Sequence, residues 1–229
     1  MERDVDCGAV YDEKRRELIA RVRSLTPTEL ALTVPATPAW SVQDVLAHVV
    51  GITADLNANR FGSGSPDEWT AAQVDSRRGR SVEQLAAEWD AETPRFVAGL
   101  ALFGYEFGSH YVGDLLQHAA DVGEALGLAP LDQDEALLVG LDHYLATFGD
   151  ALEAAQVGSV TVRAGGPERR WGAGPVVASI DADPYELFRC LGGRRRDAEV
   201  RALHWTGPAD VVDLVVPLVD AYRSTDDAP

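Results

Sequence analysis

Hydrophobic residues recur at helical spacing along roughly the first two thirds of the chain. Between Tyr11 and Leu25, the apolar side chains of Tyr11, Leu18 and Val22 fall on one face and charged residues on the other, which is typical of an amphipathic helix. The next segment, Thr26-Pro27-Thr28-Glu29, combines an N-cap, a first-turn proline and an acidic N3 residue. We therefore expect a second, short helix there, followed by a loop at 34–40.

The next predicted helix begins after Ser41, which forms a Ser-x-x-Asp capping box with Asp44. Its inward stripe contains Val45, His48 and Ile52. The pattern thus directs a histidine toward the interior.

Three further helices are expected before the pattern changes. The first runs from Ser81 to Leu102 with a kink or restart at Pro94, after a break at 62–66. The second runs from Ser109 to Leu126 and is stopped by Gly127 and Pro130. The third is capped by Asp132 and Glu135 and ends near Ala155.

From Gly158 onward, β-branched residues indicate strands at 160–162 and 176–180. A short helix at 184–191, a possible strand at 200–205 and a closing helix at 211–222 complete this part. The sequence thus predicts two domains, a helical bundle at 1–156 and a small α+β domain at 157–229.

Charge and composition exclude several classes of partner. The chain has 37 acidic and 20 basic residues, a net charge of -17, so its average field repels nucleic acid and anionic membranes. No apolar run reaches the roughly 20 residues of a membrane span, and the N-terminus does not resemble a signal peptide. We expect a cytoplasmic protein, monomeric or homodimeric, whose two cysteines, Cys7 and Cys190, are free thiols.

The candidate chemistry lies on the helix predicted at 109–126, where His110, Asp114, His118 and Asp121 lie close to one face. Asp114 and His118 are four residues apart, with Cβ atoms about 6 Å apart, so they can bind one metal ion. With His48 from a facing helix, they give two imidazoles and one carboxylate, a donor set of catalytic zinc sites with one open position.

Two neighbours of this set have different expected roles. Asp121 could accept a hydrogen bond from the second ring nitrogen of a metal-bound imidazole, and would then orient that imidazole without binding the metal itself. His110 could pair with Asp114, but it lies two turns from His118, about 12 Å along the axis, so these two cannot share one ion.

Simpler interpretations remain open for the same residues. A single inward histidine is more often a hydrogen-bonded core residue, and an acid and a histidine four apart often form an ordinary helix-surface pair. The polar face at 109–126 could also be an interhelical hydrogen-bond network without metal. If a metal binds, iron, nickel or cobalt would also suit these donors.

Two segments resemble signature segments of the mycothiol-dependent maleylpyruvate isomerase family, a branch of the DinB-like four-helix metalloproteins. They are PATPAWSVQDVLAHVVG, at 35–51, and GDLLQHAADVGEALG, at 113–127. Segments 67–89 and 183–207 resemble the family as well. The resemblance implies an α+β fold, with a DinB-like four-helix bundle followed by a smaller, sterol-carrier-like α/β unit.

The resemblance also implies a site and a reaction. His48, Asp114 and His118 match the positions of the metal ligands, and Arg194 matches an arginine suited to a bidentate grip on a substrate carboxylate. The implied cofactors are a divalent metal, zinc by expectation, and mycothiol, whose thiolate would attack a small electrophile in an isomerase or S-transferase reaction.

Two departures and one alternative qualify this function. The characterised isomerase type has Glu where this chain has Asp114, and Ala119 and Ala120 replace bulkier residues. Both changes are compatible with a non-catalytic binding or regulatory protein of DinB-like fold. The arginines at 194–196 could equally be solvated charges on an acidic surface.

Overall fold

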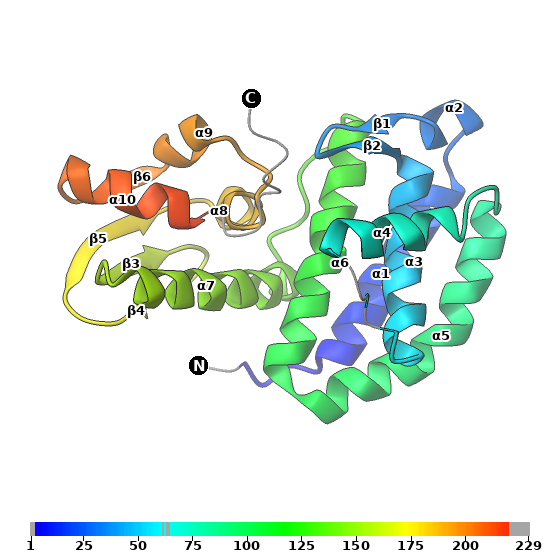
Figure 1. Cartoon of the computed structure of the whole chain (residues 1–229), viewed down its shortest axis with the longest axis horizontal. Helices are drawn as coiled ribbons and strands as arrows, with labels where there is room; N and C mark the ends of the chain where they lie inside the picture. The colour runs from blue at the N-terminus through cyan, green and yellow to red at the C-terminus, as the bar shows by residue number, and fades with distance from the viewer. Residues whose placement is uncertain (1–2, 61, 63–64, 220–229) are drawn as a thin grey trace. The chain divides into compact units, whose positions relative to one another are not determined.

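The computed structural model describes residues 3–60, 62 and 65–219. Its contacts divide the chain into two compact units, Met1–Pro130 and Leu131–Pro229 (Figure 1). The first is helical with one small hairpin, and the second combines helices with a sheet. The predicted α+β fold class is confirmed.

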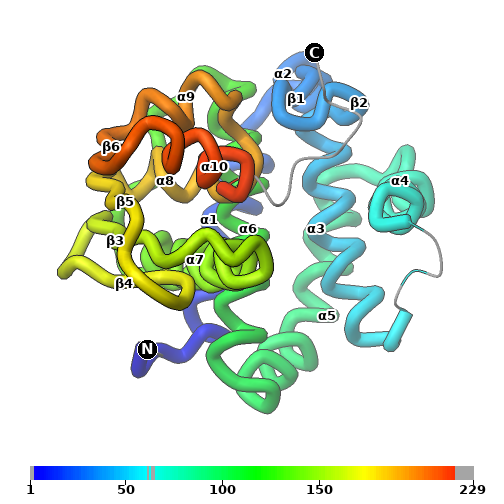
Figure 2. Tube along the Cα trace, turned by 60° about the vertical axis from the view of Figure 1, so that its left-hand side comes forward, coloured from blue at the N-terminus to red at the C-terminus, as the bar shows by residue number. Residues whose placement is uncertain are grey.

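The N-terminal unit contains a bundle of four long helices among its described residues. These helices pack against one another (Figures 1 and 2) and are α1 (Cys7–Arg23), α3 (Val42–Asn57), α5 (Val82–Phe103) and α6 (Tyr105–Ala125). The short helices α2 (Pro27–Leu30) and α4 (Pro66–Asp75) and the hairpin of β1 (Thr33–Val34) and β2 (Thr37–Ser41) complete the unit. Both α2 and α4 pack on α3.

Capping boxes determine where several of these helices begin. Ser41 accepts a hydrogen bond from the backbone of Asp44, whose carboxylate accepts one from the backbone of Ser41. The same reciprocal pattern starts α2 at Thr26 and α5 at Ser81, as the sequence predicted. The start of α3 is thus fixed, and with it the face on which His48 lies.

The bundle core is built around Trp89 of α5, which is fully buried. Its indole nitrogen donates to Thr53 Oγ1 at 3.1 Å and to Tyr11 Oη at 3.3 Å, and these two oxygens lie 3.0 Å apart. One buried hydrogen-bond cluster therefore joins α1, α3 and α5. Proline 94 lies inside α5, which continues through it as one helix.

The C-terminal unit contains a four-stranded sheet, in the order β4-β3-β5-β6, among the described residues. Its central strands are parallel and both outer pairs are antiparallel. The strands are β3 (Ser159–Arg163), β4 (Arg169–Gly172), β5 (Val176–Asp181) and β6 (His204–Thr206). The helices are α7 (Glu135–Ala155), α8 (Pro184–Leu191), α9 (Asp197–Arg201) and α10 (Ala209–Val219).

Alternate residues of the two central strands supply the core of this unit. Val160, Val162, Ala178 and Ile180 are all buried. Helix α7 packs on β3 and β4, and α10 packs on β5 and on α7. The period of two along each strand places these side chains on one face of the sheet.

Several boundaries differ from those expected. Contacts group α7 with the C-terminal unit, because it packs on β4 and α8, so the division falls after Pro130 and not at 156/157. Asp134, and not Asp132, caps α7. The predicted loop at 34–40 contains most of the β1–β2 hairpin, and the possible strand at 200–205 is the end of α9 and the start of β6.

Among the elements that were not expected are α4, β4 and α9. The end of the predicted helix at 211–222 lies outside the described residues. Within the described part of the chain, no helix has both the length and the apolar character needed to cross a membrane.

Candidate functional site

His48 lies on the buried face of α3, with 3% of its surface exposed. The indole of Trp40, one residue before the N-cap of α3, packs on its ring, with centroids 4.8 Å apart. On α4, Gln73 lies with its side-chain oxygen 2.8 Å from His48 Nδ1. His48 is therefore a hydrogen-bonded residue, and it lies in the interior, where the pattern of α3 predicted it.

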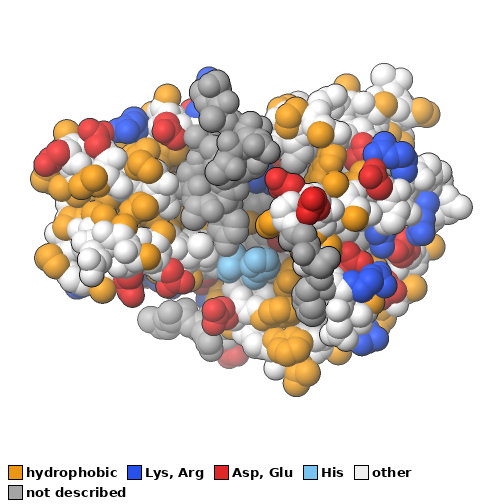
Figure 3. Space-filling model, in the orientation of Figure 1, with side chains coloured by type: hydrophobic (Ala, Val, Ile, Leu, Met, Phe, Trp, Pro, Cys, Tyr) orange, Lys and Arg blue, Asp and Glu red, His pale blue; other side chains and the backbone are white. Residues whose placement is uncertain are grey.

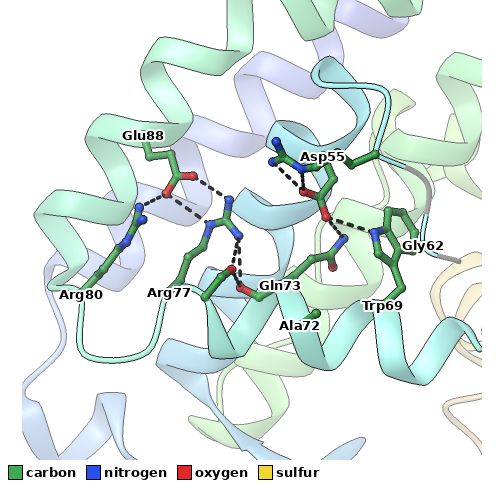
Figure 4. Close-up of a pocket in the computed structure, with 10 residues that line it drawn as sticks. Asp55, Gly62, Trp69, Ala72, Gln73, Arg77, Arg80 and Glu88 are labelled. Atoms are coloured by element: carbon green, nitrogen blue, oxygen red, sulfur yellow. Dashed lines mark hydrogen bonds and ion pairs between the residues drawn. The ribbon is translucent and has the colours of Figure 1, made fainter. Parts of the chain in front are cut away.

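Figure 4 shows that Gln73 also points toward Asp55, near the end of α3. The Gln73 amide nitrogen donates to Asp55 Oδ2 at 3.1 Å, and the Trp69 indole donates to the same oxygen at 3.0 Å. Arg60 pairs with the other oxygen at 2.8 Å. These four side chains belong to the lining of a pocket of about 580 Å³ beside α4.

His118 of α6 lies between two acidic side chains of its own helix. Its Nε2 is 3.7 Å from Asp114 Oδ1, and its Nδ1 is 3.4 Å from Asp121 Oδ2. The side chain of Asp121 is fully buried, whereas that of Asp114 is 29% exposed. His118 Nδ1 is buried and makes no hydrogen bond of regular geometry.

Helices α3 and α6 bring the two histidines together. The rings of His48 and His118 meet edge to face, with centroids 4.8 Å apart and planes at 80°. His118 thus contacts both other predicted ligands, His48 through its ring and Asp114 through Nε2.

The donor chemistry of these three side chains fits a divalent metal, because two imidazoles and a carboxylate suit zinc. Within the described residues, however, no three His, Cys, Asp or Glu side chains are gathered closely enough to hold an ion. The residues meet as two pairs that share His118. The predicted three-ligand metal site is therefore not confirmed by the geometry and stays a prediction.

Two tyrosines lie in the electrostatic field of Asp114. Burial, and secondarily the Asp114 carboxylate, raise the pKa of Tyr111 to about 12. Burial also raises the pKa of Tyr11, with a smaller contribution from Asp114. Both phenols stay protonated at neutral pH.

Other predicted residues lie apart from the histidine pair or in the second unit. His110 is half-buried and packs its ring against Tyr111. Arg194 follows Gly193 in the C-terminal unit and donates from Nη1 to the carbonyl oxygen of Gly192 at 2.8 Å. Its neighbour Arg195 pairs with Glu186 at 2.9 Å.

Comparison with known proteins gives the N-terminal unit a family. Residues 11–106 match the model described as the mycothiol maleylpyruvate isomerase N-terminal domain. Residues 11–106 of this unit thus match that domain family. The resemblance seen in the sequence is confirmed for residues 11–106, which include the segment at 35–51 but not the one at 113–127.

A solved structure has a similar fold. The mycothiol-dependent maleylpyruvate isomerase matches with a TM-score of 0.51 at 12% identity, covering 87% of this chain and 91% of that chain. A mutant of that enzyme matches at 12% identity over the same shares, with a TM-score of 0.49. A comparison with curated proteins gave no match.

Sequence analysis missed Gln73, the side chain that hydrogen-bonds to the candidate ligand His48. The missed signal was the start of α4, where Ser65-Pro66-Asp67-Glu68 combines a capping box with a first-turn proline. The Gly and Ser residues at 62–65 were interpreted as a break in the helical pattern, and the helix that follows them was not predicted. Even with α4 assigned, its sequence does not show which side chain faces His48.

Charged side chains of both signs are interspersed on the face of this domain shown in Figure 3. Arg77 of this unit is 6% exposed and pairs with Glu88 at 2.6 Å, and Arg80 pairs with the same carboxylate at 2.5 Å. These pairs join the loop after α4 to α5. Arg77 and Arg80 therefore have a structural role in this unit.

Proposed function

We propose that this protein is a metal-dependent enzyme that uses a low-molecular-weight thiol, mycothiol, to isomerise or conjugate a small electrophile. The observation that carries the proposal is the meeting of His48 with His118, and of His118 with Asp114, in a domain of the mycothiol maleylpyruvate isomerase family. The solved isomerases share the fold.

In this proposal His48, Asp114 and His118 hold the metal, with zinc as the expected ion. A bound divalent metal would lower the pKa of a thiol in its open position and favour the thiolate. Only 3% of His48 and 5% of His118 are exposed, so both imidazoles are shielded from water. Asp114, at 29%, is the candidate ligand that reaches solvent, and it marks the side from which a thiol would enter.

Asp121 acts in this proposal through His118. A buried carboxylate 3.4 Å from Nδ1 favours a proton on that nitrogen, which leaves the lone pair on Nε2, the nitrogen 3.7 Å from Asp114 Oδ1. Contacts of this kind orient metal-bound histidines in many proteins. The role of Arg194 in binding a substrate carboxylate stays a prediction, as does a cytoplasmic location.

One observation favours a second function. No three candidate ligands are gathered into a metal-binding group among the described residues. The alternative is a non-catalytic binding or regulatory protein that has kept the bundle and its polar pair.

The decisive experiment measures consumption of a free thiol. The zinc-loaded protein is mixed with mycothiol and a panel of small electrophiles, with and without a carboxylate, and the remaining thiol is titrated and products are sought. We expect turnover that chelator abolishes and zinc restores. Absence of turnover across the panel, with zinc bound, would support the binding-protein alternative.

A further inference from the structure

We propose that Gln73 is a positioning residue that holds the imidazole of His48 as the tautomer with its proton on Nδ1. Nε2 then carries the lone pair with which His48 can bind a cation. The tautomer follows from the contacts of Gln73 alone. Its consequence for metal binding rests on the proposed function.

Asp55 determines which way the Gln73 amide points. An ionised carboxylate only accepts hydrogen bonds, and Asp55 accepts from Arg60 and from the Trp69 indole. At 3.1 Å from Asp55 Oδ2, Gln73 must therefore present its NH₂ group. The amide oxygen is then the atom directed at His48, and an oxygen can only accept.

His48 must therefore supply the donor in its hydrogen bond with Gln73. Gln73 Oε1 lies 2.8 Å from His48 Nδ1, and only 2% of Gln73 and 3% of His48 are exposed. A deprotonated Nδ1 would place two lone pairs face to face at that distance, away from water, which is unfavourable. Nδ1–H is thus the favoured form.

The backbone of α3 allows α4 to approach closely enough for this bond. Gly51 lies three residues after His48, and a Cβ built there would be 2.5 Å from Gln73 Cβ and 2.9 Å from Gln73 Cγ. Glycine at 51 thus lets the root of the Gln73 side chain lie against α3. Trp69 and Arg60 hold the Asp55 end of the same chain of contacts.

This arrangement matches the way proteins orient metal-bound histidines, in which an acceptor binds the second ring nitrogen. Here the acceptor is a neutral amide and the carboxylate lies one step farther away. The arrangement therefore selects the tautomer without adding a negative charge beside the ring.

The test observes the tautomer directly in metal-free protein. Spectra that correlate the ring protons and nitrogens of ¹⁵N-labelled histidine distinguish Nδ1–H from Nε2–H, and His48→Ala identifies the His48 signals. We expect Nδ1–H in the wild type and a loss of that preference in Gln73→Leu. Gln43→Leu, a change on α3 at a residue bound to Arg80, is the matched control and should alter nothing.

Two results overturn the inference: Nε2–H at His48 in the wild type, or an unchanged tautomer in folded Gln73→Leu. If Gln73→Leu does not fold, the wild-type spectrum decides alone. Zinc affinity, measured by competition with a chelator, should fall about 10–100-fold in Gln73→Leu. Equal zinc affinity in wild type and Gln73→Leu contradicts the role in metal binding. Lack of zinc binding by the wild type contradicts the proposed function instead, and the spectra still decide the tautomer.

Discussion

His48 of α3 and His118 of α6 place their imidazole rings edge to face, with centroids 4.8 Å apart. Each has a polar contact at Nδ1, with Gln73 for His48 and with Asp121 for His118. If both Nδ1 atoms carry a proton, both rings keep their lone pair on Nε2. Two such rings and a nearby carboxylate are the basis for the proposed site.

Asp114 is the candidate ligand whose reach matters most. Its carboxylate lies 3.7 Å from His118 Nε2, and the side chain is one methylene shorter than glutamate. We predict that Asp114→Asn lowers zinc affinity by at least about tenfold, because a charged donor is lost, whereas Asp114→Glu retains or raises it. Chelator competition measures both. Wild-type affinity in Asp114→Asn would show that Asp114 is not a ligand.

A substitution at Gly51 tests how closely α4 packs on α3. Gly51→Ala places a methyl group 2.5 Å from Gln73 Cβ, so α4 must shift, and we predict a loss of about 1–3 kcal/mol in the free energy of unfolding. Denaturant titration measures this. Gly99→Ala is the control, since that helical position in α5 has no atom within 4 Å of the added Cβ, and it should gain about 0.5–1 kcal/mol. Equal effects of the two changes would contradict the close approach of α4.

The raised pKa of Tyr111 leads us to predict that the free energy of unfolding falls at alkaline pH. Its pKa is raised from 10.0 to about 12 by burial and then by Asp114, so the folded state holds the phenol proton more tightly than the unfolded state. This contribution is complete below pH 10 and is lost as the pH rises toward 12. Denaturant titrations across this range should show a fall in stability that is smaller in Tyr111→Phe. An identical fall in wild type and Tyr111→Phe would assign it to other groups.

The sequence predicted those parts of the fold that local patterns encode. The boxes at Thr26, Ser41 and Ser81 each start a helix as expected, because a cap depends on residues three apart. The inward position of His48 followed from the helical spacing of the apolar residues around it. The domain boundary did not, because whether α7 packs on the bundle or on β4 depends on tertiary contacts.

In the site, too, contacts within one helix could be predicted from the sequence, and contacts between helices could not. Asp114, His118 and Asp121 lie on one helix, so their proximity followed from spacing. That His48 lies near His118 was a hypothesis from its inward position on a facing helix, and the resemblance supported it. Gln73 was missed because it belongs to a separate helix, α4, and no local pattern reveals which of its side chains faces His48. Nor does the spacing reveal the 3.7 Å gap at Asp114.

Metal content is the measurement that tests the proposed site most directly. The wild type and His48→Ala are purified without chelator, reloaded with zinc and freed of excess metal, and the bound metal is measured for each. Binding by His48, Asp114 and His118 predicts about one equivalent in the wild type and a large loss in folded His48→Ala. Less than about a tenth of an equivalent in the wild type, or metal content that survives in His48→Ala, would contradict the site.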